Sequence, residues 1–276
     1  MDYNMDYDNI INLYSEVQQD IRFIASDVRM KIILGLNEDS KNLKLLSEET
    51  GFSPSTISHE NKKLQDKNFI LKEGRFFSLS PIGKILLMKI INLYKSNSLI
   101  KKNKKFFLNH NINCIPKHML YEIECLYEAE LLESSSKNIF YPQKIVYQHL
   151  KNSRQVKGLY PVFFPKQVEI FKQLLKNDVE INLILTDEIV DHLIDFVGNE
   201  SLNKALSRDN LVLWRTDEDL KINLAMSDTF LSLALFNENG TFDSSSILMG
   251  EKKQAIDWGD KLFEYYLDSA EKIVLD

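Results

Sequence analysis

Hydrogen-bonding side chains recur along residues 53–63 with types and spacing that suit recognition of a nucleic-acid duplex. Ile57 and Leu64 are seven residues apart, so they lie on one side of a helix and the polar residues lie on the other. Hydroxyl and imidazole groups near the start of such a helix can contact base edges in the major groove, and lysines farther along can contact phosphates. The candidate DNA-contacting residues of this segment are Ser53, Ser55, Thr56, Ser58, His59, Lys62 and Lys63.

Local signals predict that this segment is a helix of about residues 54–67. Ser53 can accept hydrogen bonds from the first free amides, and Pro54 suits the first helical position because its missing amide would be unpaired there. A shorter helix is predicted for about residues 42–50, and Gly51 can take the left-handed conformation that ends it. The polar helix is therefore predicted to be the second helix of a helix-turn-helix. The alternative is that its outer face is polar only because it is exposed.

A β-hairpin and a further helix are predicted directly after it. Residues 69–80, FILKEGRFFSLS, form two short strands around a glycine turn, with Leu71 among the inward-facing residues. Lys72 and Arg75 lie beside the turn and join the candidate DNA contacts. A helix follows over about residues 81–98. With another helix predicted ahead of the helix-turn-helix, this order is that of a winged helix-turn-helix.

The charge of the chain is unevenly divided. The 276 residues have a net charge of −6, but residues 27–112 carry +8 and residues 113–276 carry −10. Such an asymmetry is expected when one module binds nucleic acid and the remainder has another task. Chance segregation of solvated charges is the alternative.

Length and composition predict two folded domains in a cytoplasmic protein. The apolar share of 44% and the charged share of 27% are typical of a folded soluble chain, and two cysteines suit a reducing compartment. The N-terminal residues lack the basic start and apolar core of a signal peptide. The longest apolar run is interrupted by Lys84 and Lys89, so we expect no membrane segment.

The polar, basic segment KKNKKFFLNHNINCIPK has no clear periodicity and is predicted to separate the two domains. In the second domain, strands alternate with helices of roughly 11 residues, which predicts a mostly parallel sheet covered by helices. A long terminal helix is predicted from about residue 251 to residue 275. The fold class is α/β, or α+β over the whole chain. The predicted divisions are a winged helix-turn-helix domain with its N-terminal helix at 1–100, a linker at 101–116 and a sensor domain at 117–276.

Parts of both domains resemble known regulator families. STISHENKKLQDKNFI followed by GRFFSLSPIGK is similar to the winged helix domain of ArsR- and MarR-type regulators of archaea and bacteria. EINLILTDEIV, SDTFLSLALFNENGTFDSSSILMG and AIDWGDKLFEYY resemble the sensor region of the archaeal FilR1 (methanogenesis regulatory protein) family. The resemblance runs from about residue 20 to residue 270. It implies a DNA-binding transcriptional regulator of a methanogen with an uncharacterised effector domain.

Asn61 departs from the family pattern, because relatives have an apolar residue at this place. It lies on the inward side of the polar helix, about one turn after Ile57. Either Asn61 finds a buried hydrogen-bonding partner, which is what we expect, or the helix is rotated so that Asn61 joins the outer face.

Enzyme and metal chemistry find less support in the sequence. The motifs Gly-x-Gly, Gly-x-Ser-x-Gly, Gly-Lys-Ser/Thr and His-Glu-x-x-His are absent, so we expect no enzymatic activity and no cofactor. His110, Cys114 and His118 are spaced by four, with Cys125 beyond, and these are ligand types for zinc or copper. Pro116 prevents the first three from lining one regular helix, so we expect no metal site. A regulator that senses a metal or a thiol stays an alternative.

An effector pocket is expected outside the carboxyl ends of the parallel strands. Thr186, Asp187 and Glu188 directly follow a predicted strand and are candidate effector contacts, although they could instead cap the next helix. Asp228 and Trp258 lie in the family-like segments and complete the candidate set. A tryptophan in an apolar stripe is also typical of a core position.

The sequence therefore predicts a homodimeric transcription factor that binds double-stranded DNA, with an acidic domain that responds to an unidentified small-molecule effector. Dimerisation is inferred from the apolar stripe of residues 10–24 and from the long helix of residues 258–274, either of which could instead be buried within one chain. A protein-interaction module with a degenerate winged helix is the alternative.

Overall fold

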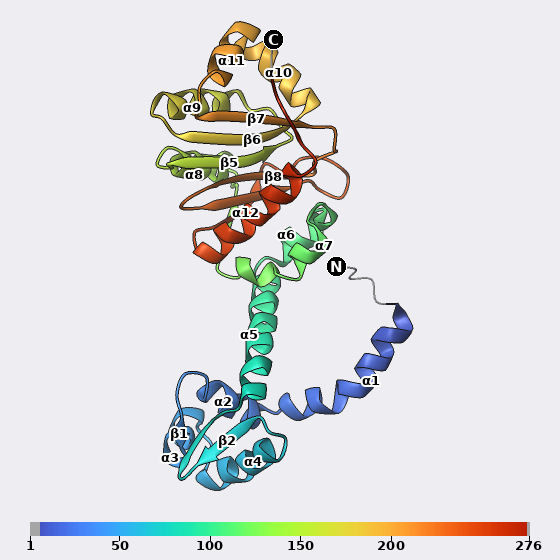
Figure 1. The fold of residues 1–276 in the computed structure, drawn as a ribbon, viewed down its shortest axis with the longest axis vertical. Coiled ribbons are helices and arrows are strands. Elements are labelled where there is room, and N and C mark those ends of the chain that lie inside the picture. Colours follow the sequence, from blue (N-terminus) through green and yellow to red (C-terminus); the bar gives the residue numbers. More distant parts are fainter. Residues whose placement is uncertain (1–5, 275–276) are drawn as a thin grey trace. The chain divides into compact units, whose positions relative to one another are not determined.

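The computed structural model describes residues 6–274, which form two compact units (Figure 1). The first unit extends to Tyr94 and the second begins at Lys95. Among residues 6–274, every helix is too short or too polar to cross a bilayer.

The first unit is a winged helix-turn-helix. Its three-stranded sheet is antiparallel, with the strand order β1-β3-β2. The helices and the sheet share one apolar core, in which Ile32, Leu46, Ile57 and Leu64 are fully buried. The elements are α1 (Tyr7–Ile24), α2 (Asp27–Gly35), β1 (Lys41–Asn42), α3 (Leu43–Thr50), α4 (Pro54–Asp66), β2 (Ile70–Glu73), β3 (Phe76–Leu79) and α5 (Pro81–Lys102), whose end belongs to the second unit.

Local capping explains where the two helices of the helix-turn-helix begin and end. The side chain of Asn42 accepts a hydrogen bond from the amide of Leu45 and so caps α3. Gly51 ends this helix in the left-handed conformation, with φ of 76°. Ser53 and Pro54 then start α4 as predicted.

The wing, defined here as β2, β3 and their connecting turn, differs from the prediction at one residue. Gly74 has φ of 59° and makes the tight turn possible. Leu71 lies opposite Ser78 and is 46% exposed, whereas Ile70 is 1% exposed. The prediction that Leu71 faces inward is therefore wrong. Neighbouring residues of a strand face opposite sides, and Ile70 takes the core position.

The start of α5 is tied to the chain segment that follows α4. Ser80 Oγ accepts a hydrogen bond from the amide of Gly83 at 3.0 Å and donates one to the carbonyl of Asn68. The amide of Ser80 donates to the carbonyl of Phe69 at 3.0 Å. A Cβ on Gly83 would lie 2.1 Å from that same carbonyl oxygen, so this close approach requires glycine.

The second unit is built on a mixed eight-stranded sheet (Figure 1). Its strand order is β11-β7-β6-β5-β8-β9-β10-β4, and only β5, β6 and β7 run parallel to one another within the described residues. The prediction of a mostly parallel sheet is therefore wrong. The reason is that β8, β9 and β10 follow one another through connections without a crossover helix, and such strands pair antiparallel.

Helices cover both faces of this sheet. One face carries α12, whose Trp258, Leu262 and Phe263 are buried among side chains of β8 and β9. The other face carries α8, α9, α10 and α11. The elements are α6 (Lys104–Asn109), η1 (Ile112–Cys114), α7 (Lys117–Leu120), η2 (Ile123–Leu126), β4 (Glu130–Glu133), α8 (Tyr141–Leu150), β5 (Gln155–Tyr160), α9 (Pro165–Lys176), β6 (Glu180–Thr186), α10 (Asp187–Val197), α11 (Asn199–Leu206), β7 (Leu211–Thr216), β8 (Ile222–Ser227), β9 (Leu231–Leu235), β10 (Ser246–Gly250), α12 (Lys253–Leu267) and β11 (Glu271–Lys272).

Residues 101–116, which the sequence assigns to a linker, belong to the folded second unit. They finish α5 and form α6 and η1. Phe106 and Ile115, each 2% exposed, pack into the same core as Trp258. The four lysines of this segment are as many as its buried residues, and its helices α6 and η1 are short, so it shows no helical period in the sequence.

The end of the chain also differs from the prediction. A helix was expected as far as residue 275, which lies outside the described residues, but α12 ends at Leu267. After it, β11 pairs antiparallel with β7, and Ile273 is buried, with its amide donating to the carbonyl of Leu213 at 2.8 Å. Burial of Ile273 favours a returning strand over a longer helix.

Candidate nucleic-acid interface

The outer face of α4 is an exposed row of polar side chains. At its start, Ser53 Oγ lies 2.8 Å from Ser55 Oγ and 2.9 Å from Thr56 Oγ1, and it accepts a hydrogen bond from the amide of Thr56 at 3.2 Å. Three hydroxyls are thus gathered at the N-terminus of the helix, where base contacts are expected. The exposed candidates are Ser53, Ser55, Ser58, His59 and Lys62, while Thr56 and Lys63 are half-buried.

Glu60 holds α4 against α2. Its carboxylate lies 2.6 Å from Nε of Arg29 and 2.8 Å from Nζ of Lys63, and its side chain is only 12% exposed. Burial acts to raise the pKa of Glu60, but hydrogen bonds from Lys63 and Arg29 outweigh burial and hold this pKa below its ordinary value. The guanidinium of Arg29 also stacks over the ring of Phe23 at 4.0 Å.

These contacts distinguish the two lysines of the α4 face. Lys63 is engaged by Glu60, so part of its charge is already neutralised. Lys62 is exposed and, among the described residues, lies within 4.0 Å of no carboxylate. The i,i+3 spacing of Glu60 and Lys63 signals their pair in the sequence, whereas nothing local points to Arg29.

Asn61 lies on the inward side of α4, so the helix is not rotated to bring it to the outer face. It is 1% exposed, and both its Oδ1 and its Nδ2 lack a hydrogen-bond partner within the described residues. The expected buried partner is therefore not found. An unpaired buried amide costs about 1–3 kcal/mol, so Asn61 weakens the core on which α4 rests.

The wing carries the two remaining candidates. Lys72 and Arg75 are both exposed. Their cationic groups lie 5.5 Å from the rings of Phe77 and Phe76, respectively. These ring contacts restrict the orientation of each cationic group, but they do not neutralise its charge.

The five candidate effector residues do not form one site. Thr186 is the last residue of β6 and the N-cap of α10, and Asp187 and Glu188 are exposed in the first turn of that helix, where acidic side chains suit the helix dipole. Asp228 accepts a hydrogen bond from the amide of Arg154.

Trp258 lies apart from these four, in the core of the second unit. It is 1% exposed, and its indole N–H donates to the carbonyl of Met119 at 3.1 Å. It therefore occupies a core position rather than the wall of a pocket.

The four candidate metal ligands are also separate. His110 is buried and bridges the carbonyl of Phe106 and the carboxylate of Asp243, while His118 is exposed. Burial raises the pKa of the Cys114 thiol to about 12, which keeps it protonated and makes it a poor ligand at neutral pH. Within residues 6–274, no group of three or more His, Cys, Asp or Glu side chains is placed to hold a metal ion.

One further pair, His149 and Lys151, has the spacing of a phosphohistidine nucleophile and its lysine. Nε2 of His149 lies 3.4 Å from the carboxylate of Glu251, and its ring packs against Phe230. Lys151 instead lines a cavity to which His149 does not contribute. The two side chains therefore have different surroundings.

Comparison with protein families matches both units of the chain. Residues 18–96 match the N-terminal domain of methanogenesis regulatory protein FilR1, and residues 139–269 match its middle domain. The chain belongs to the FilR1 family. Its winged helix and most of its mixed sheet are therefore the N-terminal and middle domains of this family.

Similar proteins include a curated FilR1 relative and two distant structures. Methanogenesis regulatory protein FilR1 of Methanothrix harundinacea (strain 6Ac) is 25% identical over 256 residues, or 91% of this chain. The chain spans 57% of the length of that relative. The archaeal chromatin protein TrmBL2 aligns over 95% of this chain and 99% of its own, with a TM-score of 0.42 and 12% identity. The phosphatidylserine synthase of Haemophilus influenzae Rd KW20 aligns over 52% of this chain and 39% of its own, with a TM-score of 0.41 and 13% identity.

Proposed function

We propose that the chain is a cytoplasmic transcriptional regulator whose ArsR/MarR-like winged helix binds double-stranded DNA under the control of the second unit. Membership of a family of regulatory proteins supports this proposal. The observation that carries it is the outer face of α4, where exposed hydroxyls and an imidazole lie toward the N-terminus and an unpaired lysine lies beyond them. The proposal gives the chain no catalytic step.

In the proposed complex, α4 enters the major groove with its N-terminal half toward the bases. Ser55, Ser58 and His59 would contact base edges, and Lys62 would contact a phosphate. The wing would place Arg75 against the backbone or the minor groove. Within the first unit, residues 27–94 hold 11 Lys and Arg against 8 Asp and Glu, a net charge of +3 that supports this orientation because it attracts a polyanion to the helix-turn-helix and the wing.

The proposed regulator acts as a homodimer joined through α1. Ile10, Leu13 and Ile21 of α1 are 50%, 48% and 58% exposed, so these residues of the predicted apolar stripe find no cover within the first unit, whereas Ile24 at the end of the stripe is buried in its core. The alternative stripe, on the terminal helix, is used inside the chain, because Trp258 and Leu262 are buried there. A second copy that covers α1 would give the two-fold symmetry that matches a roughly palindromic operator.

A salt titration of DNA binding tests the proposed function. An operator fragment is first selected by footprinting on genomic DNA, and its affinity for the full chain is then measured by fluorescence anisotropy. Binding should weaken log-linearly with salt, because bound lysines and arginines release counterions from the duplex. A protein-interaction module would instead show a shallow slope and no preference for a duplex.

Substitution of Lys62 shows whether α4 makes the contact. Lys62→Ala should flatten the slope by about one unit, since one phosphate contact is lost. Lys176→Ala, which removes an exposed lysine from α9 in the second unit, should leave it unchanged. If both variants behave alike, α4 is not the reading element and the proposal fails.

A further inference from the structure

A cavity of about 740 Å³ opens between α8 and α9 on one face of the second unit. The loop before α8 and the chain segment before β10 complete its rim. Its volume lies in the range of small-molecule sites, roughly 300–1,000 Å³. None of the residues predicted from the sequence as effector contacts lines it.

The walls of this cavity are largely apolar. Phe140, Tyr147, Phe164 and Ile170 contribute to them. Phe140 is 70% exposed, although a phenylalanine is usually covered in a folded domain. Contiguous exposed apolar surface in a concave site is typical of a site that receives an apolar ligand.

The charges around the cavity are all of one sign. Lys144, Lys151 and Lys166 line it, and none of its lining residues is acidic. Lys166 lies 3.4 Å from Glu169, whereas Lys144 and Lys151 lie within 4.0 Å of no carboxylate of the described residues. This positive rim stands out because residues 113–276 carry a net charge of −10. An anion is therefore attracted here in preference to the surrounding surface.

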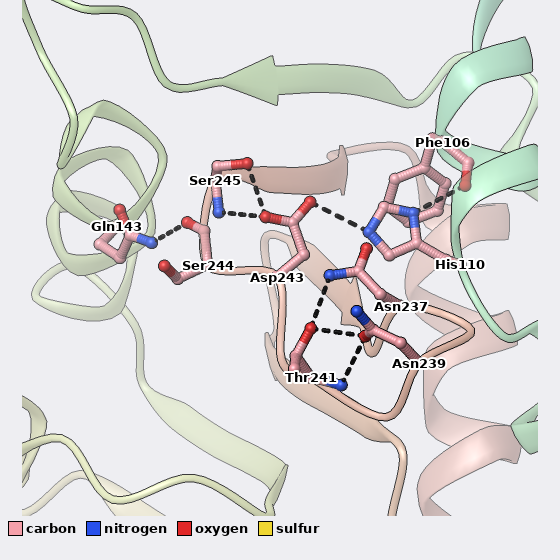
Figure 2. A network of polar contacts seen from close by, with 9 residues as sticks. All are labelled: Phe106, His110, Gln143, Asn237, Asn239, Thr241, Asp243, Ser244 and Ser245. Atoms are coloured by element: carbon pink, nitrogen blue, oxygen red, sulfur yellow. Dashed lines mark hydrogen bonds and ion pairs between the residues drawn. The ribbon is translucent and has the colours of Figure 1, made fainter.

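The polar edge of the cavity is fixed by a network of hydrogen bonds (Figure 2). Gln143 donates to the carbonyl of Ser244, while its own Oε1 is buried without a partner among the described residues. Ser245 donates to Asp243 through its amide, at 2.8 Å, and through its hydroxyl. The edge is thus ordered in advance, which lowers the entropy cost of binding a ligand against it.

We propose that this cavity binds a small amphipathic anion. Its apolar body would lie between Phe140, Tyr147 and Phe164, and its carboxylate or phosphate group would face Lys144 and Lys151. Three observations converge on this chemistry: an apolar interior, an exposed aromatic at the mouth and two unpaired cations. Binding does not depend on the proposed contact with DNA, and it is measured without DNA.

Calorimetric titration of the full chain with four probes tests the site. The probes are 2-naphthoate, 2-naphthyl phosphate, the neutral 2-naphthamide and inorganic phosphate. Both naphthyl anions should bind at least about tenfold more tightly than naphthamide, a difference of roughly 1.4 kcal/mol, and more tightly than inorganic phosphate. The tighter of the two anions identifies a carboxylate or a phosphate as the preferred group.

Variants of the rim and of the wall distinguish the contribution of charge to ligand binding from the contribution of apolar contact. The double variant Lys144→Gln/Lys151→Gln should weaken both naphthyl anions at least about tenfold and leave naphthamide unchanged. Phe140→Ala should weaken all three naphthyl probes, and Lys176→Gln, outside the cavity on α9, should weaken none. Each variant is first checked for an unchanged thermal transition. The proposal is overturned if naphthamide binds as tightly as the anions, if the double variant has no effect, or if neither anion binds at about 5 mM.

Discussion

Nε2 of His110 lies 3.0 Å from Oδ2 of Asp243, and this contact joins the end of α6 to the connection between β9 and β10 (Figure 2). The two residues are 133 positions apart in the chain, and their side chains are 3% and 17% exposed. Burial acts to raise the pKa of Asp243, but hydrogen bonds from Ser245, Ser246 and His110 outweigh it, so this pKa lies below its ordinary value of 3.8.

Asp243→Asn should therefore destabilise the second unit by about 1–3 kcal/mol at neutral pH. A carboxylate with a lowered pKa stabilises the fold above pH 3.8, and this contribution is lost as the pH falls through the folded-state value. The difference between wild type and variant should shrink on acidification below pH 3.8. Urea unfolding at several pH values, followed by tryptophan fluorescence, measures this difference in stability. The fluorescence reports on the second unit because both tryptophans, Trp214 and Trp258, lie there.

Asp217→Asn is the control, because Asp217 is exposed in a loop. It should change the stability by less than about 0.5 kcal/mol. An equal loss in both variants would show that the contact with His110 contributes nothing specific.

Glu60→Gln should destabilise the first unit by about 2–4 kcal/mol, because it leaves the shielded guanidinium of Arg29 without its counter-charge. Because the pKa of Glu60 is lowered, its contribution to stability depends on pH in the same direction as that of Asp243. This contribution is present above the ordinary value of 4.5 and disappears as the pH falls through the folded-state pKa. Differential scanning calorimetry at pH 7 and in acid measures the transition of the first unit. Glu48→Gln removes only a surface pair of 3.8 Å on α3 and should shift that transition little.

Asn61→Leu should stabilise the first unit by about 1–3 kcal/mol, since it replaces two unpaired buried polar atoms with a side chain of similar volume. For a domain of this size, each kcal/mol raises the melting temperature by roughly 4–8 °C. Asn61→Asp should act in the opposite direction, because it would bury a charge. A lower melting temperature for Asn61→Leu would mean that the amide has a partner.

Lys63→Ala should reduce the salt dependence of DNA binding less than Lys62→Ala does. The physical reason is that Glu60 already neutralises part of the charge of Lys63, whereas Lys62 has no such partner among the described residues. Parallel anisotropy titrations from low to moderate salt compare the two slopes. Equal slopes would show that Glu60 releases Lys63 when DNA binds.

Leu13→Glu should convert the proposed dimer into a monomer, because it places a charge in the exposed part of the apolar stripe of α1. Sedimentation equilibrium over a range of concentrations measures the change in mass. Phe196→Glu is the matched control, since Phe196 is 46% exposed on α10 in the second unit. A wild-type chain that stays monomeric at every concentration would contradict dimerisation through α1.

The features predicted correctly from the sequence depend on neighbouring residues. Ser53 and Pro54 start α4, and Gly51 ends α3, through contacts within a few positions of each one. The spacing of Ile57 and Leu64 likewise fixes which side of α4 is buried. Helical period and capping suffice for such features.

The features that escaped prediction depend on distant residues. The pairing of β11 with β7 and of His110 with Asp243 joins segments that no local pattern connects. Two lysines of the cavity, Lys144 and Lys166, come from different helices and read as ordinary surface charges along the chain. The antiparallel half of the sheet escaped prediction because its direction is set by the connections of β8, β9 and β10, which lack a crossover helix, and not by strand composition.

The close approach of Gly83 to the carbonyl of Phe69 gives a marker for finding relatives of this wing among divergent sequences. Any side chain at this position would collide with main-chain atoms. A homologue with the same wing geometry must therefore have a glycine three residues beyond the serine that caps α5. A homologous sequence with a larger residue there must have reshaped the base of its wing. The contact with a duplex proposed here should not be carried over to such a homologue.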